Sequence, residues 1–248
     1  MIKKEKQKLS VADCRRNIAA FLTENKKEMT VAVCVAAMIL VSGLYFGCKI
    51  WQMIPLFVST LIVMTLQMKA NRYMFLVGGF NALIGYTSVY LSQGLYASAL
   101  YAVLCSGPIQ LVTFALWQKK AYKHSTQLKR LTKKQILWIS LGTIAAWLLM
   151  YVIFSLLGSP YLVLDNSVSL LGIIGTIMSL LSYLEYTIIS LACTLTSVAL
   201  YVDVILDQPD QIPHLIYNIY CAITTWISFR YMVKLHREQK DETNIEAK

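Results

Sequence analysis

About eight apolar stretches follow one another between Thr30 and Lys234, and nearly all lysines and arginines lie outside them. One stretch, Leu137–Gly158, runs for 22 residues without a charge. A helix needs roughly 18 to 20 apolar residues to cross the hydrocarbon core of a bilayer. Charged residues make up 15% of the chain, whereas a water-soluble domain has about 25%. The pattern therefore predicts an all-α, polytopic membrane protein.

The pattern predicts eight membrane spans, and each boundary has a margin of a few residues. They are 30–48, 51–67, 73–92, 95–118, 137–158, 162–181, 184–205 and 212–233. The connections are short, so the chain divides into an N-terminal segment 1–29, one transmembrane domain 30–234 and a tail 235–248. Segment 1–29 is expected to stay attached and to form an amphipathic helix at the membrane surface.

The basic residues predict the orientation of the chain in a cell membrane. If the spans alternate in direction, 22 lysines and arginines fall on the side of the two termini, and only Lys49 falls on the other. Because cytoplasmic segments carry the excess of Lys and Arg, both termini and the 119–136 loop are expected in the cytoplasm. The net charge of +10 is then explained by anchors beside the spans, which contact lipid headgroups, and nucleic acid is not an expected partner.

The chain also repeats itself weakly. When positions are shifted by 113, Tyr73 meets Tyr186 and Asn81 meets Thr194. This register predicts three spans, a linker span at 137–158 and three further spans, with the first span outside the repeat. An odd number of spans separates the two triplets, so they would be parallel repeats about an axis along the membrane normal.

No pattern in the sequence indicates catalysis. Zinc-protease, serine-hydrolase and phosphate-loop motifs are absent, and so are paired carboxylates within a span. The three histidines are too dispersed for a metal site, and no cofactor is expected. The six cysteines form no CxxC pair. The absence of a mid-span carboxylate favours facilitated passage of a solute over proton coupling.

The spans contain uncharged polar and aromatic residues that suit a neutral, ring-containing, hydrogen-bonding solute. Amides are costly in hydrocarbon unless they are partnered, so Asn81 and Gln110 should face the interior, either as links between helices or as solute contacts. Tyr101 and Tyr217 lie deep enough to stack on a ring. The full set of candidate binding residues is Asn81, Tyr101, Gln110, Thr187, Ser190, Thr194, Tyr217 and Asn218.

Other polar and special residues receive structural roles. Tyr90, Tyr161 and Tyr201 lie near span ends, where tyrosine is typical of the interfacial belt. Pro108 follows Gly107 in mid-span and predicts a kink, which is either a hinge for alternating access or a static bend. Asp165 begins the sixth expected span and is expected to cap that helix.

Several segments, in the right order over residues 50–235, resemble the PnuC family of vitamin transporters. They are KANRYMFLVGGFNALIGYTSVYLSQGLYASALY at Lys69–Tyr101, PIQLVTFALW at Pro108–Trp117, Asp165, and IMSLLSYLEY at Ile177–Tyr186. The resemblance implies two three-helix bundles joined by a linker helix, as in SWEET sugar transporters, assembled as a homotrimer. It also implies uptake of nicotinamide riboside or a related vitamin, which a cytoplasmic kinase then phosphorylates and traps.

The penultimate span departs from the family pattern YxExWxxWxxxN. Thr187, Ser190 and Thr194 stand where that pattern places aromatic residues and an asparagine. Two lost indoles remove about 1–3 kcal/mol of stacking each. Nicotinamide riboside is therefore the first expectation, while thiamine, riboflavin and a deoxynucleoside stay open. A non-transporting membrane scaffold or sensor, whose polar residues only link helices, is the rival from another functional class.

Overall fold

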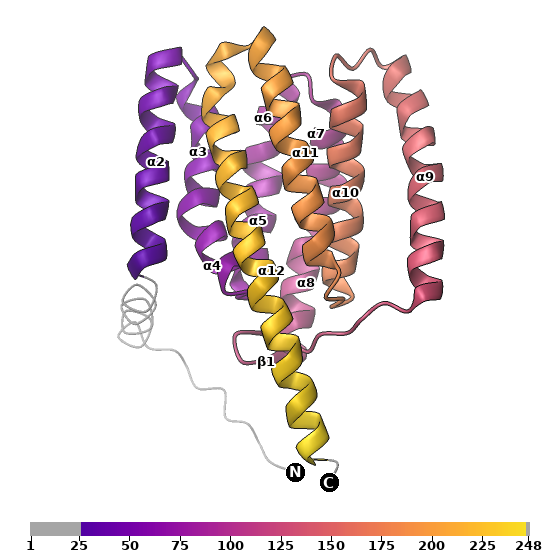
Figure 1. The fold of residues 1–248 in the computed structure, drawn as a ribbon. Helices are drawn as coiled ribbons and strands as arrows, with labels where there is room; N and C mark the ends of the chain where they lie inside the picture. The colour runs from indigo at the N-terminus through magenta and orange to yellow at the C-terminus, as the bar shows by residue number, and fades with distance from the viewer. Residues whose placement is uncertain (1–25, 247–248) are drawn as a thin grey trace.

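The computed structural model describes residues 26–246 and confirms an almost entirely helical membrane protein. Within these residues, seven helical segments are long and apolar enough to cross a membrane. They are α2 (Lys26–Phe46), Ile50–Met68, Tyr73–Ser92, Tyr96–Lys119, α9 (Lys133–Leu156), α10 (Leu162–Leu180) and α11 (Tyr186–Asp207). An eighth, α12 (Ile212–Glu246), runs beside them (Figure 1). The predicted spans are thus recovered.

The eighth helix is the least apolar of the set for a structural reason. Its inner face buries His214, Asn218, Thr224 and Thr225, and its part from Arg230 onward is rich in charged residues, so both lower its mean hydropathy. The helix also continues to Glu246, so most of the expected tail 235–248 extends α12. At the other end of the chain, α2 begins at Lys26, and the amphipathic helix expected in segment 1–29 lies mostly outside the described residues.

Three consecutive spans each contain a central π-helical turn. The first is α3 (Ile50–Val58), η1 (Ser59–Val63) and α4 (Met64–Met68); the second is α5 (Tyr73–Asn81), η2 (Ala82–Tyr86) and α6 (Thr87–Ser92); the third is α7 (Tyr96–Tyr101), η3 (Ala102–Ser106) and α8 (Gly107–Lys119). Pro108 is the second residue of α8 and lies two residues after η3, and its missing N–H accounts for a widened turn before it. An irregular turn thus lies beside Pro108, while the kink and its use as a hinge or a static bend stay predictions.

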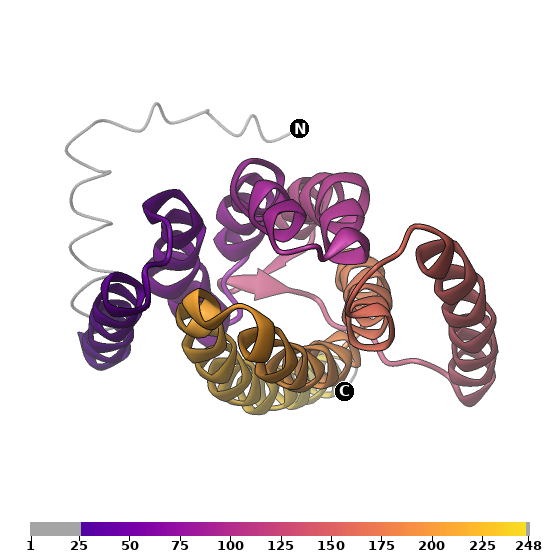
Figure 2. The same cartoon turned by 90° about the horizontal axis from the view of Figure 1, so that it is seen from above.

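The helices form two triplets with a linker between them, as predicted. The first triplet is the three π-containing spans, and the second is α10, α11 and α12. Each triplet runs down, up and down in Figure 1, so the two are parallel, and together they form a ring when viewed from above (Figure 2).

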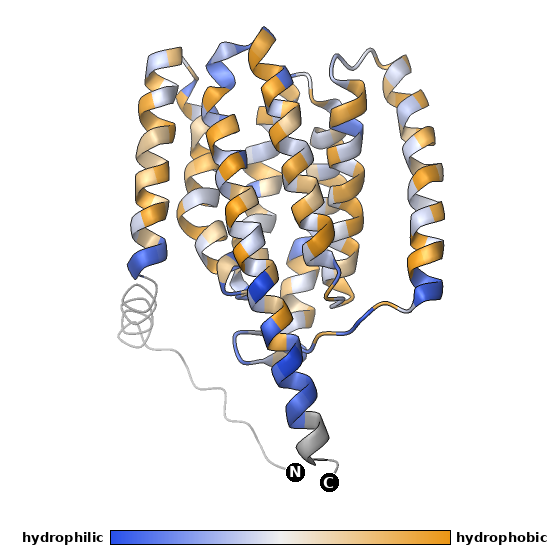
Figure 3. Ribbon diagram, viewed as in Figure 1, coloured by the Kyte–Doolittle hydropathy of each residue, from blue (hydrophilic) through white to orange (hydrophobic). Residues whose placement is uncertain are grey.

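The linker α9 packs on α10 at the edge, with Phe154 as its one buried residue. The N-terminal α2 packs on α12 and α3, outside the repeat. Apolar residues cover the outer faces (Figure 3).

The 119–136 loop contains a short antiparallel hairpin, β1 (Ala121–Tyr122) and β2 (Ser125–Thr126). It lies across one end of the ring (Figure 2), which we call the hairpin end. Gln239 of α12 holds it, since its Nε2 donates to the Thr126 carbonyl at 2.9 Å and its Oε1 accepts from the Leu128 N–H at 3.0 Å. Glu185 accepts from the Leu131 N–H at 3.2 Å.

The sequence analysis expected Asp165 to cap its own helix, and this expectation is wrong. Asp165 lies in the first turn of α10, is fully buried, and its carboxylate accepts hydrogen bonds from the Ala97 N–H at 2.9 Å and the Ser98 N–H at 3.1 Å, as well as from the Ser98 hydroxyl. These N–H groups belong to the first turn of α7, which has no partner for them within its own helix. One carboxylate therefore caps a helix of the other triplet and joins the two halves.

Candidate functional site

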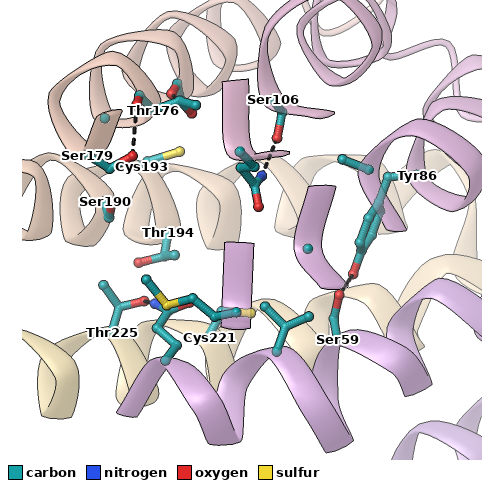
Figure 4. Close-up of a pocket in the computed structure, with 18 of the residues that line it drawn as sticks. Ser59, Tyr86, Ser106, Thr176, Ser179, Ser190, Cys193, Thr194, Cys221 and Thr225 are labelled. Atoms are coloured by element: carbon teal, nitrogen blue, oxygen red, sulfur yellow. Dashed lines mark hydrogen bonds between the residues drawn. The ribbon is translucent and has the colours of Figure 1, made fainter. Parts of the chain in front are cut away.

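A cavity of about 280 Å³ lies between the two triplets. Its wall is built from both halves, and none of the described residues that line it is a lysine, arginine, histidine, aspartate or glutamate. Six candidates from the sequence do line it: Tyr101, Gln110, Ser190, Thr194, Tyr217 and Asn218. In Figure 4, Ser59 and Tyr86 face Ser179 and Ser190 across the space. The cavity suits a small uncharged or singly charged molecule.

One wall carries hydrogen-bonding groups held in place by their neighbours. The Gln110 amide donates from Nε2 to the Ser106 hydroxyl at 2.7 Å, and the Tyr101 hydroxyl lies 2.8 Å from Oγ1 of Thr176. These residues come from α7, η3 and α8 on one side and α10 on the other. No hydrogen bond among the described residues uses Oε1 of Gln110, which lies beside the backbone of Gly78, another lining residue.

The opposite wall is aromatic. The rings of Tyr86 and Tyr90 stack with centroids 5.5 Å apart at 23°, and Tyr217 lies 6.1 Å from Tyr86 at 31°. The Tyr86 hydroxyl donates to Oγ of Ser59 at 3.1 Å, which fixes the ring. The assignment of Tyr90 to an interfacial belt is therefore wrong, because the η2 turn brings it to the cavity. Tyr201 is buried as well.

Two candidates from the sequence lie outside the cavity lining. Asn81 donates from Nδ2 to the Pro55 carbonyl at 2.9 Å and to Oγ of Ser59 at 2.8 Å, so its contacts fit the role of a link between helices. Thr187 is buried and donates to the carbonyl of Leu184, which lies just before α11, at 2.8 Å. The link of Asn81 to the cavity is indirect, because Oγ of the lining residue Ser59 accepts hydrogen bonds from both Asn81 and Tyr86.

Replacement of Asn81 by alanine is expected to lower the free energy of unfolding by about 1–3 kcal/mol, since the Pro55 carbonyl and Ser59 lose a buried donor. Solute affinity should fall by less than about tenfold, because the side chain does not reach the cavity. Thermal unfolding and solute titration of the purified protein measure the two effects separately. A total loss of binding with unchanged stability would contradict this role.

The sequence prediction missed other lining residues, among them Ser59, Thr176, Cys193 and Cys221. Helical spacing carried a signal for two of them. Cys193 comes three residues after Ser190 and Cys221 three after Asn218, so each shares a helix face with a predicted residue. Ser59 lies in the π-helical turn η1, where the regular spacing fails.

The family model described as "Nicotinamide mononucleotide transporter" matches residues 49–233 of this chain. The chain belongs to the nicotinamide mononucleotide transporter family. The match includes both triplets and the linker α9, and it leaves out α2, which also stands outside the repeat. The protein is thus a multi-pass membrane transporter and not an enzyme.

A solved structure agrees with the family assignment. The fold is similar to that described as "Crystal structure of the Vitamin B3 transporter PnuC", with a TM-score of 0.72 and 16% sequence identity over 85% of this chain and 92% of that one. At this identity the likeness establishes the fold of this family member and leaves its substrate open. A comparison with curated proteins gave no significant match.

Proposed function

We propose that the protein takes up a small, non-phosphorylated, nucleoside-like vitamin, with nicotinamide riboside as the first candidate. The uncharged cavity lining carries this proposal. The family description names a mononucleotide, but a phosphate monoester brings about 1.5 to 2 negative charges. The described part of the lining holds no cation that would compensate these charges, and burying an unpaired charge is very costly. A neutral solute, or a single positive charge beside tyrosine rings, fits the lining better.

The two walls divide the recognition between them. Tyr86 and Tyr217 would pack on the ring of the solute, in place of the aromatic residues missing from α11. Gln110, Tyr101 and Asn218 would hydrogen-bond the sugar hydroxyls or the amide. Ser190 and Thr194 face them from α11, with short side chains that leave room. Thiamine, riboflavin and deoxynucleosides remain candidates because these short residues also accommodate other rings.

Several finer features accompany the proposed transport. We place the hairpin end and both termini in the cytoplasm, because the basic residues gather on that side. Passage would be downhill, since no carboxylate among residues 26–246 lines the cavity, and a cytoplasmic kinase acting on the solute would make uptake effectively irreversible. A SWEET-like fold and a homotrimer follow from the family resemblance. These features are proposed together with the substrate.

Ligand-induced thermal stabilisation of the detergent-purified protein tests the proposed substrate. The panel is nicotinamide riboside, its 5′-phosphate, thiamine, riboflavin and deoxynucleosides, and a ligand at 100 times its Kd adds about 2.7 kcal/mol. We expect stabilisation by the riboside and none by the phosphorylated form. Tyr86→Ala should abolish the shift, whereas Tyr45→Ala, on the exposed face of α2, should keep it.

The other outcomes are equally informative. Stabilisation by the mononucleotide would contradict the argument from the uncharged lining. A shift with thiamine, riboflavin or a deoxynucleoside alone would move the substrate to that compound. If no compound stabilises the protein and none is taken up by proteoliposomes, the scaffold function becomes the better one.

A further inference from the structure

A cluster of buried amides and aromatic rings lies at the end of the bundle opposite the hairpin (Figure 1). Gln93, which follows α6, donates from Nε2 to Oε1 of Gln211 and accepts at Oε1 from the Tyr201 hydroxyl at 2.9 Å. Their exposed fractions are 1%, 1% and 4%. Gln93 belongs to the first triplet, whereas Tyr201 lies on α11 and Gln211 in the 3₁₀ turn η4 (Pro209–Gln211) before α12. The hydrogen bonds of this outer cluster therefore cross from one half of the protein to the other.

The outer cluster continues the walls of the cavity. Residues three or four apart share one face of a helix, and three such rows connect the lining to the cluster. They are Tyr86, Tyr90 and Gln93; Cys193, Ser197 and Tyr201; and Asn218, His214 and Gln211. In each row the first residue lines the cavity. A solute leaving the cavity toward this end would have to pass the cluster.

His214 is an unpaired polar group within this closure. It is 1% exposed, its ring lies parallel to that of Tyr201 at 7° with centroids 5.5 Å apart, and neither Nδ1 nor Nε2 has a hydrogen-bond partner among the described residues. A buried polar group without a partner raises the free energy of the state that buries it. Opening of the cluster would return the imidazole to water and remove that cost.

We propose that Gln93, Tyr201 and Gln211 form the outer gate of the transport path, and that His214 biases this gate toward opening. The gate's position on the outer side rests on the orientation under the proposed function. Alternating access requires that contacts between the halves break at one end while those at the other end hold. The outer cluster has the required form, because side-chain hydrogen bonds close it, with one further bond of 3.4 Å from Nε2 of Gln208 to the Gln93 carbonyl. Asp165 joins α7 to α10 beside it and is not part of the gate. The hairpin end is held by main-chain and side-chain bonds together.

Two free thiols report whether the gate is open. Cys193 and Cys221 line the cavity and form no disulfide, so a solute-sized reagent can reach them only through an open end. The parent protein for the test keeps these two and carries serine at the other four cysteines. Intact cells are treated with a small, membrane-impermeant, charged methanethiosulfonate, and labelling of each thiol is followed by mass spectrometry.

Opposite changes are expected from the two kinds of gate variant. Gln93→Ala and Gln211→Ala remove the bonds between the halves, and labelling of Cys193 should become about tenfold faster, which corresponds to about 1.4 kcal/mol. His214→Phe keeps a ring beside Tyr201 and removes the unpartnered nitrogens, so labelling should become severalfold slower. The control is Gln52→Ala at the same end. Gln52 is also a buried amide, but its bond to Oγ of Ser92, at 2.9 Å, stays within the first triplet.

The labelling rate decides for or against the gate independently of the substrate. If Gln93→Ala is labelled at the parent rate in folded protein, or if Gln52→Ala accelerates labelling equally, the outer gate is wrong. If the thiols of His214→Phe are labelled at the parent rate or faster, His214 does not bias the gate toward opening. Because labelling needs no solute, a gate that responds while no vitamin binds would leave the gate standing and overturn the proposed substrate. If a vitamin binds but the gate variants are labelled at the parent rate, the proposed substrate stands and the gate is overturned.

Discussion

Replacing Asp165 by alanine is expected to lower the free energy of unfolding by about 3 kcal/mol or more, the largest loss expected from one side chain in this protein. The carboxylate accepts from two N–H groups and one hydroxyl of α7, and hydrogen bonds to a charged group contribute about 1.5–3 kcal/mol each, with partial overlap. Alanine would leave the Ala97 and Ser98 N–H groups buried without partners. Thermal unfolding in detergent, followed by intrinsic fluorescence, measures the loss.

Asp207→Ala is the matched control for this effect. Asp207 lies at the same end of the bundle on the exposed surface, and its Oδ2 accepts one bond, from the Tyr161 hydroxyl at 3.0 Å. Because Asp207 is exposed and water can replace the bond, its loss should cost less than about 1 kcal/mol. Equal melting temperatures for the two variants would show that Asp165 does not hold the triplets together. Asp165→Asn should lie between them, since one amide oxygen still accepts.

Gly172→Val is expected to reduce uptake about 100-fold in protein that still folds. Gly172 on α10 lets the ring of Tyr101 lie against the backbone, and a Cβ there would lie 2.7 Å from Cζ of that ring. The ring would have to leave its contact with Thr176 and enter the cavity. Such overpacking costs about 1–3 kcal/mol, and a 100-fold change corresponds to about 2.7 kcal/mol. Uptake of labelled solute, normalised to surface expression, measures the effect.

Gly142→Val controls for the loss of a helical glycine. Gly142 lies in mid-helix on α9, and a Cβ there would meet nothing within 4 Å. Glycine and valine differ in helix propensity by only a few tenths of a kcal/mol. Uptake by Gly142→Val should therefore stay within about twofold of the parent. If Gly142→Val and Gly172→Val reduce uptake equally, the position of the Tyr101 ring does not matter for transport.

The span pattern and the repeat could be predicted from the sequence because they depend on local properties. Apolar length and the placement of lysine and arginine are local features of the chain, and they predicted every span, including α12, whose polar inner face weakens its hydropathy. The shift of 113 paired Tyr73 with Tyr186, and these residues begin α5 and α11. The uncharged polar residues also indicated a solute-binding interior.

The faces of the helices were decided by the tertiary structure. Asn81 and Gln110 are both in-span amides, yet only Gln110 reaches the cavity. Asn81 ends α5 and Tyr86 ends the following π-helical turn η2. Such a turn adds about one residue, and so rotates the rest of the helix by about 100° relative to the 3.6-residue period. No proline marks η2 in the sequence, so the inward turn of Tyr86 and Tyr90 could not be predicted.

Long-range pairings were likewise beyond the sequence. Gln93 meets Tyr201 and Gln211 across 108 and 118 residues, and Asp165 caps a helix that begins at Tyr96. The sequence by itself determined that the chain spans a membrane as two parallel triplets around an uncharged polar interior, because hydrophobic length and charge placement suffice for that. Which side chains line the cavity, cap a neighbouring helix or close one end depends on helix rotation and on contacts between distant segments. Those are properties of the packed bundle alone.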